Sequence, residues 1–268
     1  MKKFFISCDI EGTCGIAAWE ETEASHAAYG AFADQMSREV AAACEGLLAA
    51  GATDIRVRDA HSSARNIRPS LLPQREEITL MRGWGREPQG MTCGLDSSYD
   101  GVLFTGYHSA CGWDGNPLSH TSNLQNVYVK INGEVAPELM YNSLTAAMHG
   151  VPVLMVAGDK MLCDWFHTKV PAAITVPVSE GMGNGSVAMM PEVAQRKIRE
   201  AAERAANLNP KDCLYPVPDA FEIEICYREH QKARANSWFP GAKQKDSRTV
   251  VYASDKWMDI LVFMHFCM

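Results

Sequence analysis

The stretch FFISCDIEG, residues 4–12, joins a short apolar segment directly to two carboxylates. Its first part, Phe4–Asp9, has the length and apolar character of a buried strand. Asp9 and Glu11 are two residues apart, which places their side chains on the same side of an extended chain. Gly12 has no Cβ atom and therefore allows another backbone to approach closely. The stretch predicts a buried strand that ends in a polar site.

The same arrangement occurs twice more along the chain. The predicted strand Thr53–Asp59 leads into His61, and the predicted strand Gly101–Gly106 leads through Tyr107 to His108. Because parallel strands of an α/β sheet present their carboxyl ends along one edge, the three polar strand ends are expected to converge there.

The remaining periodicity completes an α/β pattern, in which strands alternate with helices. We therefore predict an α/β fold with a mostly parallel central sheet flanked by helices. We expect one domain over residues 1–268, with a smaller C-terminal lobe over about 209 to 268, a region that opens with three prolines by residue 218. The other predicted strands are Glu77–Met81, Asn126–Ile131, Val151–Ala157, Ile174–Val178, Phe221–Tyr227 and Thr249–Ala253, and the predicted helices are His26–Ala50, Pro137–His149, Pro191–Asn207 and Asp255–Phe266.

Composition excludes several classes of protein. The 268 residues carry a net charge of −7, which disfavours binding to nucleic acid or to an anionic membrane. The longest apolar run, Val151–Ala157, is far shorter than the ~20 residues of a membrane span, and Asp9 follows the apolar start too soon for a signal peptide. The nine cysteines form no C-x-x-C pair, which indicates reduced thiols rather than a redox motif. We expect a soluble, cytoplasmic protein.

The residue types at the strand ends indicate the chemistry. Carboxylates combined with imidazoles suit zinc or manganese and are typical of catalytic rather than structural sites. Several carboxylates can bridge a pair of metal ions, as in many hydrolases. The side chain of Cys8 is expected to face away from that of Asp9 and is not a candidate ligand.

Taken together, these motifs resemble the D-aminopeptidase family of zinc metallopeptidases (family M55). The likeness rests on Cys8–Gly12, Asp59–Ser62, Gly106–Ser109 and Ser119–Thr121, and it continues through Asn132–Glu138 and Val151–Asp159. It covers nearly the whole chain and is clearest from Met1 to Asp159.

The resemblance implies a site with two Zn²⁺ ions per subunit. Carried over motif by motif, Asp9 is the expected bridging ligand, and His120 matches the catalytic histidine of the family. Its role as nucleophile, general acid/base or oxyanion donor stays open. Asp59 is expected to orient a metal-bound imidazole. The full set of expected metal ligands is Asp9, Glu11, His61, His108 and Glu138.

The resemblance also implies an activity and an assembly. Family members remove an N-terminal D-amino acid from short peptides such as D-Ala-D-Ala, and they assemble as homo-oligomers, as a decamer of two rings around a channel. The chain departs from the family pattern at Arg58, where Asn is common, and at Ser179–Gly185, where relatives carry a Lys and then an Arg. These departures bear on substrate preference and assembly.

Two other functions remain open at this point. The first is another metal-dependent hydrolase, such as an amidase, an L-peptidase or a phosphoesterase. The last of these would need an anion-binding feature, and the sequence has no phosphate loop. The second is a non-catalytic ring scaffold that retains its metal site and binds zinc without turnover.

Overall fold

The three strands that were predicted to end in polar residues all belong to the larger of the protein's two sheets. A computed structural model describes residues 2–268. Neighbouring strands in this sheet are parallel, except that the last two form an antiparallel hairpin. In order across the sheet, the strands are β3 (Ile78–Met81), β2 (Asp54–Asp59), β1 (Lys3–Cys8), β4 (Gly101–Tyr107), β7 (Val153–Asp159), β8 (Ile174–Met182) and β9 (Gly185–Ala188).

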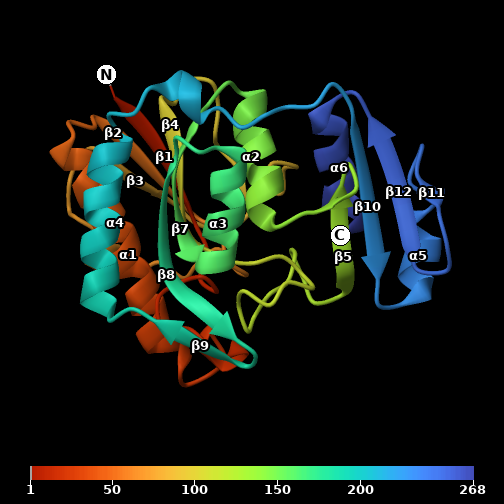
Figure 1. The fold of residues 1–268 in the computed structure, drawn as a ribbon, viewed down its shortest axis with the longest axis horizontal. Coiled ribbons are helices and arrows are strands. Elements are labelled where there is room, and N and C mark those ends of the chain that lie inside the picture. The colour runs from red at the N-terminus through yellow and green to blue at the C-terminus, as the bar shows by residue number, and fades with distance from the viewer. Residues whose placement is uncertain (1) are drawn as a thin grey trace.

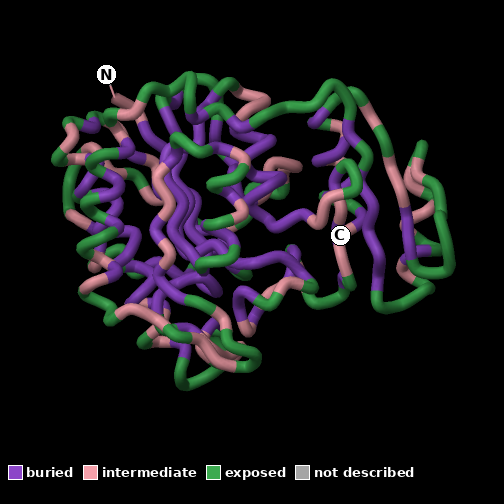
Figure 2. Tube along the Cα trace, viewed as in Figure 1, coloured by how far each residue is buried: buried purple, intermediate pink, exposed green. Residues whose placement is uncertain are grey.

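Helices cover both faces of this sheet, as expected for parallel strands with continuously apolar sequences. The helices α1 (Tyr29–Ala49) and α4 (Pro191–Ala205) pack together on one face, and α2 (Glu138–Met148) and α3 (Lys160–Lys169) lie on the other (Figure 1). The central strands β1, β4 and β7 are almost wholly buried (Figure 2). The predicted fold class is confirmed.

A second, antiparallel sheet lies to one side of the first (Figure 1). Two helices accompany it, α5 (His230–Asn236) and α6 (Trp257–Cys267). Helix α6 lies between this sheet and α2, where Trp257 Nε1 donates a hydrogen bond to Thr145 Oγ1 over 3.0 Å. The strand order is β11 (Lys243–Gln244), β12 (Thr249–Ser254), β10 (Phe221–Tyr227), β5 (Asn126–Ile131) and β6 (Glu134–Val135).

The second sheet draws on two separate parts of the chain. Strands β5 and β6 come from residues 126–135, whereas β10, β11 and β12 come from residues 221–254. A single domain with a smaller C-terminal lobe stays a prediction, and we propose that this lobe includes β5 and β6 as well as residues 209–268. None of the helices within residues 2–268 combines the length and the apolar character needed to cross a bilayer.

The strand order places β1 at a topological switch point. Strands β2 and β3 lie on one side of β1, and β4, β7 and β8 lie on the other. In open α/β sheets, ligands bind at the carboxyl ends of the strands beside such a point. The predicted polar strand ends follow β1, β2 and β4, and they therefore meet where this architecture places a site.

Two glycines allow the ends of β1 and β4 to touch. A Cβ atom on Gly12 would lie 1.9 Å from Tyr107 O, and one on Gly106 would lie 2.1 Å from Asp9 O. Gly106 also has a φ of 70°, which other residues rarely adopt. Backbone hydrogen bonds of 2.9 Å (Asp9 N to Thr105 O) and 2.8 Å (Gly12 N to Gly106 O) join the two segments. The close backbone approach predicted at Gly12 is confirmed, and Gly106 takes part in the same contact.

Candidate metal centre

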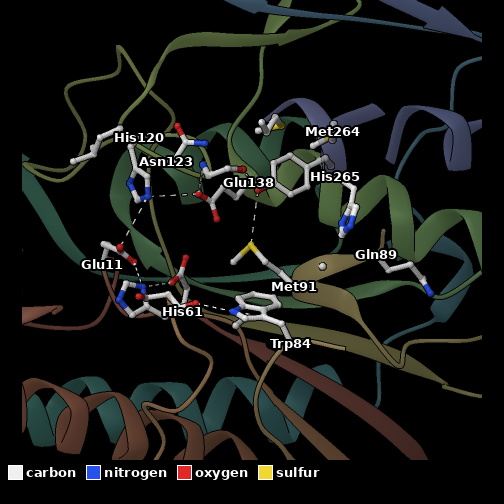
Figure 3. Close-up of a pocket in the computed structure, with 18 of the residues that line it drawn as sticks. Glu11, His61, Trp84, Gln89, Met91, His120, Asn123, Glu138, Met264 and His265 are labelled. Atoms are coloured by element: carbon white, nitrogen blue, oxygen red, sulfur yellow. Dashed lines mark hydrogen bonds and ion pairs between the residues drawn. The ribbon is translucent and has the colours of Figure 1, made fainter. Parts of the chain in front are cut away.

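Six ionisable side chains meet beyond the carboxyl ends of the parallel strands, and Figure 3 labels four of them, Glu11, His61, His120 and Glu138. Each is at most 8% exposed. Asp9 and His108 directly follow β1 and β4, and Glu11 lies three residues beyond β1. His61 lies two residues beyond β2, and Glu138 is the first residue of α2. His120 comes from the loop between β4 and β5. The structure thus brings together all five predicted metal ligands and the predicted catalytic histidine.

The first group of three consists of Asp9, Glu11 and His61. His61 Nδ1 lies 3.2 Å from Asp9 Oδ1 and 3.1 Å from Glu11 Oε2. The contact between His61 and Glu11 does not have the geometry of a hydrogen bond, and Glu11 Oε2 has no hydrogen-bond partner within residues 2–268. The candidate ligand atoms of all three side chains therefore lie around one shared space.

The second group consists of His108, His120 and Glu138. Glu138 Oε1 lies 3.7 Å from the Nε2 atoms of both histidines. The two imidazoles stack, with ring centroids 4.3 Å apart and an angle of 8° between their planes. His120 thus lies within the cluster itself rather than at its rim.

Asp9 connects the two groups. Its Oδ1 atom faces His61, whereas its Oδ2 atom lies 3.6 Å from His108 Nε2. A carboxylate whose two oxygens face different histidines has the disposition of a bridging ligand. The geometry is consistent with the predicted bridging role of Asp9, which stays a prediction.

Backbone carbonyls set the orientation of all three imidazoles. His61 Nε2 donates to Thr22 O over 2.9 Å, so its Nδ1 atom faces the cluster. His108 Nδ1 donates to Ser109 O and His120 Nδ1 donates to Leu118 O, each over 2.9 Å. Their Nε2 atoms therefore face the cluster. Such outer hydrogen bonds are typical of metal-binding histidines.

Burial and crowding shift the pKa values of these groups in opposite directions. Burial and the neighbouring Glu11 raise the pKa of Asp9. Burial alone would raise the pKa of Glu11, but the nearby imidazoles, His61 above all, lower it well below its usual range. Burial opposes the charged form of His108, but Glu138, Glu11 and Asp9 raise its pKa to about 9. Without a metal ion, the cluster is thus neutralised by protons on His61, His108 and Asp9.

The donor set fits a pair of divalent cations. His108 Nε2 is buried and has no hydrogen-bond partner among the described residues, which is costly unless another group binds it. In each group, the three donor atoms lie within 4.8 Å of one another. Three carboxylates and three imidazoles without a thiolate match the ligand chemistry of catalytic zinc.

Asp59 does not orient an imidazole, contrary to the sequence-based expectation. Its carboxylate accepts hydrogen bonds from Asn66 N, Asn66 Nδ2 and Ile67 N at 2.5–2.8 Å. Asn66 Nδ2 also donates to His61 O over 2.7 Å. Asp59 therefore holds the loop that carries His61, whereas the ring of His61 is oriented by Thr22.

Two other contacts were not predicted from the sequence. Trp19 lies in a 3-10 turn, η1 (Trp19–Glu21), and packs edge-on against His120 with ring centroids 5.2 Å apart. Asn116 Nδ2 donates to Glu11 O over 3.0 Å. Neither Trp19, Thr22 nor Asn116 lies in a motif or a periodic segment, so the sequence offered no signal for them.

The cluster forms one end of a cavity of about 430 Å³. Its lining contains the carboxylates Asp9, Glu11, Glu23 and Glu138, and no lysine or arginine among the described residues. A cavity of this size and charge accommodates a small cationic ligand and disfavours an anionic one such as a phosphate ester.

Comparisons with known proteins agree with this geometry. Residues 1–266 match the sequence profile of Peptidase M55, described as D-aminopeptidase. The chain is 28% identical over 252 residues to a D-aminopeptidase of Bacillus subtilis (strain 168), covering 93% of this chain and 90% of that protein.

A solved structure has the same fold. It is described as the Zn-dependent D-aminopeptidase DppA from Bacillus subtilis, a self-compartmentalizing protease. The superposition has a TM-score of 0.90 at 25% identity and covers 99% of this chain and 96% of that one.

A buried carboxyl behind the Glu11 loop gives a pH-dependent prediction. Glu39 Oε1 accepts hydrogen bonds of 2.9 Å from Cys14 N and Gln35 Nε2, and burial raises its pKa to about 7. The folded state therefore keeps this proton to higher pH than the unfolded chain, so the free energy of unfolding falls as pH rises from about 4.5 to about 7. Glu39→Gln removes this loss. When the pH is raised from 5 to 8, the unfolding free energy of the variant should therefore gain about 2 kcal/mol relative to that of the unsubstituted protein.

Urea denaturation of EDTA-treated protein at both pH values measures this difference. Glu45→Gln, at an exposed position of the same helix, is the matched control and should follow the unsubstituted protein. Equal pH dependence in the Glu39 and Glu45 variants would contradict the prediction.

Proposed function

The chain belongs to the D-aminopeptidase family, peptidase family M55, and on this premise we propose that it is a zinc-dependent aminopeptidase that releases the N-terminal D-amino acid from short peptides of the D-Ala-D-Ala type. One observation carries the proposal, namely two groups of three metal-binding side chains joined by the carboxylate of Asp9. The zinc dependence and the D-aminopeptidase name of the Bacillus subtilis proteins support it.

We propose two zinc ions per subunit. Asp9, Glu11 and His61 would hold one ion, and Asp9, His108 and Glu138 would hold the other. When bound, such a pair supplies a Lewis acid for the scissile carbonyl and a water of lowered pKa. Loading the site displaces the protons that the imidazoles carry in the metal-free protein, because only their neutral form can bind a metal.

The protein's own residues place the peptide. The ammonium group at the peptide's N-terminus is cationic, and Glu23 is the one carboxylate side chain in the described lining that is not a proposed zinc ligand. The N-terminus therefore belongs at the carboxylate end, which puts the first peptide bond next to His120. The rest of the peptide extends towards the other end of the cavity.

His120 is suited to proton transfer. Burial and the adjacent His108 lower the pKa of His120, so it is neutral at pH 7 and its Nε2 can accept a proton. Leu118 O holds the proton on Nδ1, which keeps the Nε2 lone pair facing the cavity. We propose that His120 takes a proton from the attacking water and passes it to the leaving amine. This makes it a general acid/base rather than a nucleophile.

The direct test is amino-acid release from D-Ala-D-Ala and L-Ala-L-Ala by purified protein. EDTA treatment should abolish release, and added zinc should restore release from the D-peptide. Restored cleavage of the L-peptide alone would keep the metal chemistry and refute the D-selectivity. Zinc binding without release from either peptide would refute the aminopeptidase function and favour the scaffold alternative.

A second prediction separates the role of His120 from that of a ligand. His120→Ala should keep two zinc ions per chain and lower kcat for D-Ala-D-Ala by about 10²- to 10⁴-fold, the usual contribution of a general acid/base. His108→Ala should lose one zinc ion. Metal content by plasma mass spectrometry and initial rates measure both effects.

His230→Ala, in α5 and away from the cavity, is the control and should match the unsubstituted protein. A loss of zinc in His120→Ala would make His120 a ligand. Full turnover in that variant would exclude any catalytic role for it.

We also propose that the chain forms a homo-oligomer, a decameric ring that admits only short peptides. The self-compartmentalizing character of the Bacillus subtilis neighbour supports this. So do three exposed apolar side chains around the β8–β9 hairpin, since Met182, Val187 and Met190 are 62–70% exposed. Light scattering should give a mass ten times that of the 29.5 kDa chain, and Val187→Lys should lower it. A monomer mass would contradict the assembly.

The cytoplasmic location stays a prediction. All nine cysteines lie in the described part of the chain, and all are buried free thiols, which is compatible with a reducing compartment.

A further inference from the structure

The cavity continues well beyond the metal cluster and changes character along its length. In Figure 3, Glu11, His61, His120 and Glu138 gather at one end, whereas Met264 and His265 lie at the other, with Met91 and Trp84 between them. The far end is formed partly by α6, which supplies Leu261 and Met264. One end of the cavity is therefore ionic, and the other is apolar.

Four side chains make up this apolar part, which we call the apolar wall: Trp84, Met91, Leu261 and Met264. Three of them are at most 8% exposed and are packed into the protein, whereas Trp84 is 38% exposed. Tyr141 OH contacts Met91 Sδ at 3.8 Å, which links the wall to α2. The wall is thus a supported surface, and Trp84 is its most accessible member.

Two contacts hold the indole ring of Trp84 in place. Its Nε1 donates to Ser62 O over 2.7 Å, and the guanidinium carbon of Arg58 lies 4.5 Å from its ring centroid. Arg58 is fully buried and donates through Nη1 to Gly83 O over 2.5 Å, but its Nε and Nη2 atoms have no hydrogen-bond partner within residues 2–268. A desolvated cation with so few partners interacts strongly with an aromatic ring. Arg58, a departure from the family pattern, therefore holds Trp84 in place.

The charges along the cavity decide what the wall can receive. Neither lysine nor arginine lines the described cavity, and the ionisable side chain labelled at its far end is that of His265. A charged group placed against the four side chains of the wall would lose its hydration, which is unfavourable. A neutral apolar group would bury its surface there at a gain.

On the premise of the proposed aminopeptidase activity, we infer that the apolar wall binds the apolar side chain of the residue directly after the scissile bond. The peptide's N-terminus is held at the carboxylate end, so the part released as the new amine faces the wall. The preferred substrates are then peptides whose second residue carries an apolar side chain.

Two substrates with the same N-terminal residue test this inference, namely D-Ala-D-Leu amide and D-Ala-Gly amide. For the unsubstituted zinc-loaded protein, kcat/KM should be about tenfold higher for the leucine amide than for the glycine amide, the ratio expected for burying one such side chain.

Trp84→Ala should reduce the leucine-to-glycine ratio to near one. The matched control is Trp238→Ala, because Trp238 also stacks with an arginine, Arg234 at 5.1 Å, but is 73% exposed and lies in the second lobe. The control should keep the ratio of the unsubstituted protein. An unchanged ratio in Trp84→Ala would overturn the inference.

The alternative position for an apolar side chain is the N-terminal residue itself. Comparing D-Leu-Gly amide with D-Ala-Gly amide distinguishes the two positions. If Trp84→Ala changed this ratio and left the ratio for the second residue intact, the wall would serve the N-terminal side chain, and the inference would be wrong.

A binding measurement separates this inference from the proposed function. Calorimetric titration of EDTA-treated protein with the two D-Ala amides needs no turnover. Tighter binding of the leucine amide, lost in Trp84→Ala, would support the wall even if the loaded protein cleaved nothing. Equal binding of both amides would refute it whether or not the protein is an aminopeptidase.

Discussion

The structure depends on the burial of three carboxylates and three imidazoles in one small space. Charges that are removed from water must be neutralised by close partners, because the interior solvates them poorly. Here the neutralisation is shared across the cluster, since the Asp9 carboxylate faces His61 with one oxygen and His108 with the other. The same arrangement that makes the metal-free cluster costly suits it to divalent cations, because a bound cation would replace protons that the cluster otherwise carries.

The backbone is shaped to permit this crowding. The ends of β1 and β4 approach so closely that Gly12 and Gly106 leave no room for a side chain. This contact brings Asp9 next to His108, although the two are far apart in the sequence. The imidazoles are then oriented by carbonyls of surrounding loops, so the precision of the cluster comes from backbone atoms and not from additional charged groups.

The two ends of the cavity suit different parts of a peptide. Its ionic end suits a cationic N-terminus beside the scissile bond, and its apolar wall suits the apolar side chain of the next residue. Both sheets contribute to the wall, since Trp84 follows β3 of the parallel sheet and Met264 belongs to α6, which packs on the antiparallel one. Arg58 was noticeable in the sequence as a departure from the family pattern, and its place behind Trp84 gives that departure a physical role in the shape of the cavity.

The sequence by itself determined the parallel sheet, the strands that end in ligands and all six side chains of the cluster, because strand periodicity and the i, i+2 spacing of Asp9 and Glu11 are local properties and the family motifs supply the rest. Only the tertiary structure decided that Thr22 orients His61, that Asp59 braces a loop through Asn66, and that α6 forms part of the cavity. It also decided that β5 and β6 join the C-terminal strands in one sheet. These contacts join segments far apart in the chain, and packing alone selects them, since no periodicity in either segment records which partner it will meet.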